Sequence, residues 1–271
     1  MTDIYNIQDF GPSDLMTSDI EGSRRLKVSS EDFTLLVSKG LIAGHSMVYV
    51  NSCAESIGVT PKLIWPFASQ YVITDTPSTF YLSSSNASDN QSVLIEWLDS
   101  NYEQQTSIIA LTGQTPVAFA AGVGLRVNKC RTIGTVSKTL GDVYISRALG
   151  HTGGVPTNTA MIVSGYRAKS QTSNLALFSV PAGHTLFGLS GYFSAPKGRD
   201  NDFFWNVRNS SLGIPPTETN VVSIYQSVIE INFEMTLIPE KTDAYFTSDT
   251  QNSTGRVSCR VVGMLVDNEY L

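Results

Sequence analysis

The sequence is poor in charged residues, and this shortage limits the partners that the protein can have. Only 15% of its 271 residues are Asp, Glu, Lys or Arg, against roughly 25% in ordinary soluble domains. The formal net charge of -6 argues against nucleic-acid binding, because a protein that follows a phosphate backbone needs clustered Lys and Arg. The polar surface is supplied instead by Ser, Thr, Asn and Gln. Surfaces of this kind can contact other subunits without the cost of desolvating charge.

Cysteines and long apolar runs are scarce as well. The three cysteines, Cys53, Cys130 and Cys259, are odd in number and far apart, so we expect no disulfide framework. No apolar run approaches the roughly 18 residues that cross a membrane. The first residues lack the basic segment and apolar core of a signal peptide. We therefore expect no membrane as a partner and no export by a signal peptide.

Residues that carry chemistry are equally few. No two of the histidines His45, His151 and His184 have the i, i+4 spacing of metal ligands on a helix. No G-x-S-x-G motif marks a serine nucleophile. The glycine pattern that begins at Gly122 has Val127 where a dinucleotide-binding loop needs its last glycine. We expect no enzyme activity, no catalytic residue, no cofactor and no metal.

Two acidic segments give alternatives to this expectation. Residues 99–103 resemble the start of a calcium loop, but Gln104 and Ala110 occupy the positions of its essential Gly and Glu, so we predict a turn. Asp202 precedes an aromatic run that could bind sugar. Alternation within that run places Trp205 in the core and leaves Phe204 as the exposed aromatic and a candidate partner-binding residue.

Alternation of apolar and polar residues is the strongest structural signal. One buried face is predicted for Ile229, Ile231, Phe233, Met235 and Leu237, and a second for Val257, Cys259, Val261 and Leu265. Side chains on a strand point to opposite faces at every second residue, so both segments are predicted to be half-buried strands. Together with many short strands between turn residues, they predict an all-β fold of antiparallel β-sandwich or jelly-roll modules.

Residues 1–44 are predicted to form an N-terminal arm and one short helix. The helix follows Ser29 or Ser30, buries Phe33, Leu36 and Val37, and ends at Gly40. The arm carries the aperiodic anchors Tyr5, Phe10 and Leu15, which are candidate partner-binding residues. A frayed terminus is the alternative to an arm that docks on a neighbouring subunit.

Two β modules are predicted to follow, 45–155 and 156–271. The boundary falls in the Gly- and Pro-containing segment 149–158. The segment 221–237 is too long for one ordinary strand, and we predict a bend near residues 225–228.

Five segments between about residues 70 and 268 resemble a family of tailed-phage virion structural proteins. They are Tyr81–Val117, Gly141–Ser146, Ser179–Phe193, Ile238–Phe246 and Val257–Asn268. The first of them keeps the family residues Asp89, Gln91, Val93, Ile95, Leu98, Asp99, Asn101 and Tyr102.

The resemblance implies a bacteriophage virion protein that is assembled in the host cytoplasm. The leading role is a capsid decoration or cement protein, whose partners are the major capsid protein and further copies of itself, for example in a trimer. The alternative is a tail, adaptor or fibre component with receptor or glycan contact. A glycan-cleaving enzyme is a third class. An extended fibre would show repeats or a heptad stalk, and this sequence shows neither.

Overall fold

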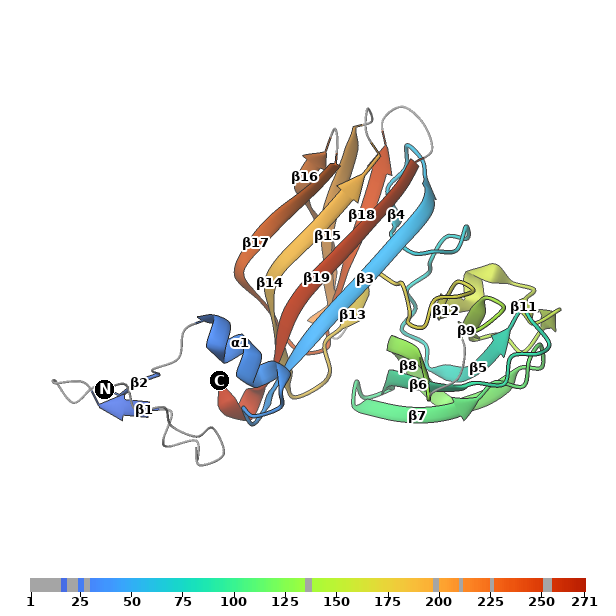
Figure 1. Cartoon of the computed structure of the whole chain (residues 1–271), viewed down its shortest axis with the longest axis horizontal. Helices are drawn as coiled ribbons and strands as arrows, with labels where there is room; N and C mark the ends of the chain where they lie inside the picture. Colours follow the sequence, from blue (N-terminus) through green and yellow to red (C-terminus); the bar gives the residue numbers. More distant parts are fainter. Residues whose placement is uncertain are drawn as a thin grey trace.

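The computed structural model describes residues 16–18, 24–26, 30–134, 138–196, 200–209, 212–224, 227–250 and 255–271. Within these ranges the chain is almost entirely β-structure with a single α-helix, and its strands pair in antiparallel fashion. The predicted all-β, sandwich-like fold is confirmed. In Figure 1 a tall β-sandwich stands beside a smaller β module.

Two sheets form the sandwich. The first has the strand order β17-β14-β19-β3 and consists of β3 (His45–Ile57), β14 (His184–Ala195), β17 (Ser227–Ile238) and β19 (Gly255–Asp267). The second has the order β13-β18-β15-β16, with β4 also paired to β18. Its members are β4 (Lys62–Leu63), β13 (Leu177–Ser179), β15 (Asn201–Asn209), β16 (Ile214–Ile224) and β18 (Asp243–Thr250).

The smaller module is built on a six-stranded sheet of order β12-β9-β5-β8-β6-β7. Its strands are β5 (Ser78–Ser84), β6 (Ser92–Asp99), β7 (Gln104–Ala110), β8 (Val117–Ile133), β9 (Val143–Ser146) and β12 (Ile162–Tyr166). The long β8 bends at Ala120–Gly122, where three successive residues have positive φ angles, so that one part pairs with β5 and the other with β6. A small hairpin, β10 (His151–Thr152) and β11 (Val155–Pro156), and a 3₁₀ turn, η2 (Thr159–Met161), complete the module.

The smaller module is an insertion within the sandwich. All its strands lie between β4 and β13 in the chain, while the sandwich takes strands from both sides of it. The sequence pattern predicted two consecutive modules, 45–155 and 156–271, and the observed arrangement differs from this. β3 pairs with β19 from the second predicted module, and β12, which follows residue 155, pairs with β9 from the first. Sequence punctuation marks turns, but it does not show which distant strand a given strand will join.

The helix α1 (Ser30–Ser38) lies at the foot of the first sandwich sheet. Val37 is buried and the ring of Phe33 packs edge-on against His45 at 5.8 Å, in agreement with the predicted apolar face. Gly40, at a φ of +70°, ends the helix: its amide bonds to the Val37 carbonyl and the amide of Leu41 to the Leu36 carbonyl. This is a Schellman motif, which favours glycine because its left-handed conformation strains other residues.

A 3₁₀ turn, η4 (Asn268–Tyr270), follows β19, and β1 (Met16–Ser18) pairs with β2 (Arg24–Leu26) in a separate two-stranded sheet.

Aromatic residues fill the sandwich core. Phe193 from one sheet lies 5.1 Å from Phe203 of the other, between ring centroids, and Trp205 lies 4.9 Å from Phe246. Burial of Trp205 confirms that this indole belongs to the core. Each such side chain buries a large apolar area, so these rings are a main source of sandwich stability.

The prediction for the last strand is confirmed, whereas that for β17 is wrong in part. Val257, Cys259, Val261 and Leu265 of β19 are all buried. On β17, Ile231 and Phe233 pack on the core, but Leu237 is 58% exposed and lies on the opposite face. The pairing of β17 with β14 is irregular at this point, since Gly188 pairs with Thr236 but Ser190 pairs with Asn232, and such an irregularity interrupts the alternation of a strand.

Two turn predictions are also confirmed. Asp99 holds a tight turn, because its Oδ1 accepts the backbone amides of Asn101 at 2.8 Å and Glu103 at 3.0 Å. The long segment 221–237 is interrupted where predicted: the chain leaves β16 at Ile224 and enters β17, in the other sheet, at Ser227.

Candidate functional site

A buried ion pair joins the two modules. Arg126 on β8 donates from Nε and Nη2 to the two carboxylate oxygens of Asp243 on β18, at 3.0 and 2.8 Å. Both side chains are 1% exposed. Ser179 Oγ of β13 donates a further hydrogen bond to Asp243. Burial lowers the pKa of Arg126, but the hydrogen bonds and charge of Asp243 outweigh this effect and raise it.

A second layer of polar contacts surrounds this pair. Asp75, in the segment between the modules, accepts from Arg126 at 2.8 Å and also pairs with Arg208 of β15. Asn128 of β8 bonds both the amide and the carbonyl of Ser179, so a side chain takes the place of a neighbouring strand. These contacts connect the smaller module, the segment with Asp75 and the sandwich. Together they fix the orientation of one module on the other.

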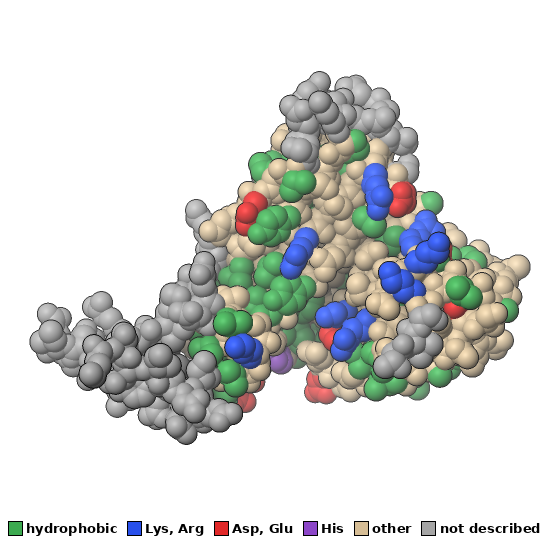
Figure 2. All heavy atoms as spheres, in the orientation of Figure 1, with side chains coloured by type: hydrophobic (Ala, Val, Ile, Leu, Met, Phe, Trp, Pro, Cys, Tyr) green, Lys and Arg blue, Asp and Glu red, His purple; other side chains and the backbone are tan. Residues whose placement is uncertain are grey.

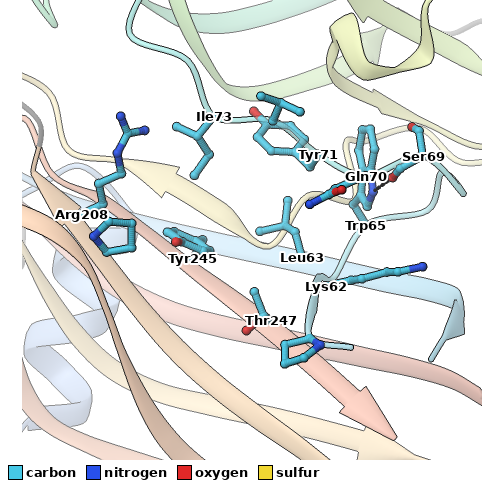
Figure 3. A pocket seen from close by; sticks show the side chains of 13 residues that line it. Lys62, Leu63, Trp65, Ser69, Gln70, Tyr71, Ile73, Arg208, Tyr245 and Thr247 are labelled. Atoms are coloured by element: carbon cyan, nitrogen blue, oxygen red, sulfur yellow. Dashed lines mark hydrogen bonds between the residues drawn. The ribbon is translucent and has the colours of Figure 1, made fainter. Parts of the chain in front are cut away.

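A pocket of about 370 Å³ opens where the segment between β4 and β5 crosses the outer face of the second sandwich sheet. Figure 3 shows Leu63 and Tyr245 in its middle, with Tyr71 and Ile73 on one side and Trp65 on another. The rings of Trp65 and Tyr71 meet edge to face at 5.2 Å. The Tyr71 hydroxyl donates to the Val163 carbonyl of the smaller module, and burial raises the pKa of Tyr71 to about 12. The walls are therefore aromatic and aliphatic, and Trp65 and Tyr71 are held in place.

Polar groups in this pocket are mostly uncharged. The Gln70 amide extends from the Trp65 side toward Leu63 and Tyr71, whereas the Lys62 ammonium points away from the centre (Figure 3). The remaining cation, Arg208, is held by Asp75. Ser69 Oγ is buried in the lining without a hydrogen-bond partner, although the Ser69 carbonyl accepts from the Trp65 indole at 2.9 Å.

The outer face of the first sandwich sheet carries a row of four apolar side chains. Strand register places one on each strand, in the order Leu237, Phe187, Met264 and Met47. Residues paired across antiparallel strands share a face, so these four are neighbours. In Figure 2 hydrophobic side chains gather over this lower part of the sheet, next to α1. We call the row the apolar row.

The rows beyond it become gradually more polar. The next row contains Val262 and Tyr49. Tyr49 is 40% exposed, and the Arg260 guanidinium lies over its ring, 5.9 Å from the ring centroid. The third aligns Arg260 with Tyr192 and then with Glu230. The sheet face thus has an uncharged end near α1 and a charged, aromatic middle, which is the residue composition of a protein contact surface.

The three histidines have structural roles at turns. His45, His151 and His184 each follow a glycine, and the Nδ1 of each bonds the carbonyl two residues earlier at 2.8 Å. His184 starts β14, as expected for a histidine that caps a turn at a strand entrance. In the part of the chain that the structure describes, no three His, Cys, Asp or Glu side chains gather in a way that could hold a metal ion.

One contact resembles a catalytic dyad. Ser146 Oγ lies 3.3 Å from His151 Nε2. Ser146 is fully buried, however, and its hydroxyl donates to the Ala148 carbonyl at 2.9 Å. A nucleophile must be reachable by substrate. The contact is therefore best interpreted as a brace for the hairpin β10–β11.

The structure describes only one of the four predicted partner-binding residues, Phe204. Tyr5, Phe10 and Leu15 lie outside the described residues. Phe204 is partly buried on the outer face of β15, where it pairs in register with Thr247 of the pocket lining, but it does not itself line the pocket. No described contact links it to another of the four.

Sequence reasoning missed the pocket residues, although a signal was present. Trp65, Phe67 and Tyr71 form an aromatic cluster within seven residues, in the segment between β4 and β5. An aromatic cluster in a connecting segment is unusual and indicates either a packed crossing or a binding surface. Tyr245 could not be linked to this cluster, because it lies far away in sequence.

Thiol labelling provides a test of the burial of the cysteines. Burial raises the pKa of Cys130 to about 12 and also raises that of Cys259, while Cys53 lies partly exposed on the outer sheet face. A raised pKa leaves little thiolate at pH 8, and the thiolate is the reactive form. We expect one fast-reacting thiol per native chain with a disulfide reagent and three after unfolding. Cys53→Ser should remove the fast phase; two or three fast thiols in the native protein would contradict the fold.

No helix among the described residues has the length and apolar character needed to span a membrane.

Comparison with known proteins identifies no family. No family model and no curated protein matches the sequence. Similar solved structures include infectious bursal disease virus, Gt strain, at 9% identity and a TM-score of 0.24, covering 84% of this chain and 74% of that chain. The STIV MCP is 8% identical with a TM-score of 0.20, and the match covers 82% of this chain and 98% of that chain. The CBM22 tandem domain of Paenibacillus barcinonensis Xyn10C is 12% identical with a TM-score of 0.23, and the match covers 80% of this chain and 98% of that chain. Viral capsid proteins are thus among the weak structural neighbours, but TM-scores this low carry no argument.

Proposed function

We propose that this protein is a structural component of a bacteriophage particle, and specifically a capsid decoration or cement protein that stabilises the shell. The apolar row on the outer face of the first sandwich sheet is the observation that carries this proposal. Leu237 is 58% exposed and the other three side chains are partly exposed. An accessible apolar patch with a polar surround is typical of a protein interaction site. The sequence resemblance to tailed-phage virion proteins supports the same role.

The apolar row suits a contact with another subunit for an energetic reason. Leu237, Phe187, Met264 and Met47 carry no charge, so covering them releases water without desolvating an ion. The neighbouring Tyr49 and Arg260 are of the residue types that contribute most to binding at protein interfaces. The major capsid protein is the proposed partner, together with further copies of this chain, for example in a trimer.

A cement protein must also transmit force between its contacts. The buried Arg126–Asp243 pair and the Asn128–Ser179 bonds couple the smaller module to the sandwich. Such coupling allows a contact on one module to restrain a contact on the other. We propose that the arm with Tyr5, Phe10 and Leu15 adds a further docking segment.

We also propose that this role requires no catalysis. The buried carboxylates of the described chain are engaged in structural bonds: Asp243 holds Arg126, and Asp89 accepts the amides of Leu140 and Gly141 together with the Ser84 hydroxyl. A carboxylate used in this way stabilises loops rather than acting on a substrate.

A tail, adaptor or fibre component with glycan contact is the second candidate. The aromatic pocket around Tyr245 favours it, because this pocket joins apolar walls to uncharged hydrogen-bonding groups. The two roles predict different places in the particle, on the head or on the tail.

Binding to particles that lack the protein separates these roles. Purified full-length chain is mixed with isolated heads and with isolated tails, and each mixture is sedimented. The proposed role predicts saturable binding to heads and an increase in their resistance to heat. Saturable binding to tails alone would favour the second candidate, and binding to neither would contradict both.

A further inference from the structure

We propose that the pocket formed by the crossing segment and the second sandwich sheet is a binding site for a neutral saccharide. This inference deepens the second candidate function, glycan contact, by naming the class of saccharide, and it does not depend on the proposed role at the shell. The pocket, at about 370 Å³, falls within the size range of ligand sites and is large enough for a sugar ring with its first neighbour.

The walls fit the apolar faces of a sugar. Leu63, Tyr245 and Ile73 present apolar surface to the cavity, and Trp65 closes one side (Figure 3). Pyranose rings present C–H groups on their flat faces, and these pack on aromatic and aliphatic side chains. Trp65 and Tyr71 are fixed by their edge-to-face contact and by hydrogen bonds to the Ser69 and Val163 carbonyls, so the walls are preorganised.

The polar groups fit the hydroxyls of a sugar. Gln70 extends into the pocket with an amide that both donates and accepts hydrogen bonds. Ser69 Oγ has no hydrogen-bond partner among the described residues, but it is enclosed by the protein. The Gln70 amide therefore supplies the polar contact with the ligand.

The charges favour a neutral rather than an acidic sugar. Among the described residues no carboxylate lines the pocket, and neither of the two cations in its lining is available at the centre. Arg208 is paired with Asp75, and the Lys62 ammonium points outward in Figure 3. An acidic sugar would lose its hydration without gaining an ion pair.

The test uses the full chain against an array of defined oligosaccharides, followed by NMR titration of the binders. The array contains neutral oligosaccharides built from glucose, galactose or N-acetylglucosamine and matched oligosaccharides that contain glucuronic acid. We expect at least one neutral oligosaccharide to bind. Gln70→Ala should weaken this binding at least tenfold, and Gln171→Ala, which removes an exposed glutamine outside the pocket, should leave it unchanged.

Three results would overturn the proposal: no oligosaccharide binds, binding is unaffected by Gln70→Ala, or the glucuronic acid oligosaccharides are preferred. Sedimentation with phage heads is scored separately for Gln70→Ala. Because Gln70 lies far from the apolar row, this variant should bind heads as the parent does, so a failure of the saccharide site is distinguishable from a failure of the structural role.

Discussion

Replacement of Arg126 by methionine is expected to lower the free energy of unfolding by about 3–5 kcal/mol. The change leaves the Asp243 carboxylate buried, 1% exposed, and without its bidentate partner. An uncompensated buried charge is much more costly than the loss of a surface ion pair. Chemical denaturation monitored by tryptophan fluorescence measures the change.

Arg256→Met is the matched control for this prediction. Arg256 lies 3.7 Å from Glu55, and the two side chains are 66% and 57% exposed, so its removal should cost less than about 1 kcal/mol. The double variant Arg126→Met with Asp243→Leu should be more stable than Arg126→Met alone, because it removes the buried charge as well. Equal effects of Arg126→Met and Arg256→Met would show that the junction does not hold the modules together.

The second large effect is expected at the apolar row. Leu237→Glu combined with Met264→Glu should weaken binding to phage heads at least about 100-fold, equivalent to ~2.7 kcal/mol, because two carboxylates would be desolvated at the contact. The thermal unfolding temperature should change little, since both side chains lie on the outer sheet face. Sedimentation at a series of protein concentrations measures the affinity.

Val59→Glu is the control for the apolar row. Val59 is strongly exposed in the connection between β3 and β4, at the other end of the sheet from the apolar row. The Val59→Glu substitution adds a carboxylate to the surface without changing the proposed contact. Unchanged head binding by the Leu237 and Met264 variant would place the contact elsewhere on the protein.

Local structure was predictable from the sequence where short-range rules decide it. The alternation in β19, the Schellman end of α1 at Gly40 and the turn held by Asp99 each depend on residues within a few positions of one another. β17 shows the limit of such rules. Its alternation predicted that Leu237 is buried, but the face of Leu237 depends on the irregular pairing of β17 with β14, a strand far away in the chain.

The candidate sites were not predictable for the same reason. Arg126 and Asp243 are separated by 117 residues, and each is an ordinary charged residue in its own segment. The pocket joins Trp65 and Gln70 to Tyr245 because β4, which precedes them, pairs with the distant strand β18. Strand order decides both sites, and neither composition nor periodicity encodes strand order directly.

Electron cryo-microscopy of the assembled particle tests the structural role most directly. The account predicts density for the sandwich and the inserted module on the outer surface of the head, with the β17-β14-β19-β3 face and its apolar row against the major capsid protein. Density confined to the tail, or purified infectious particles without the protein, would contradict it.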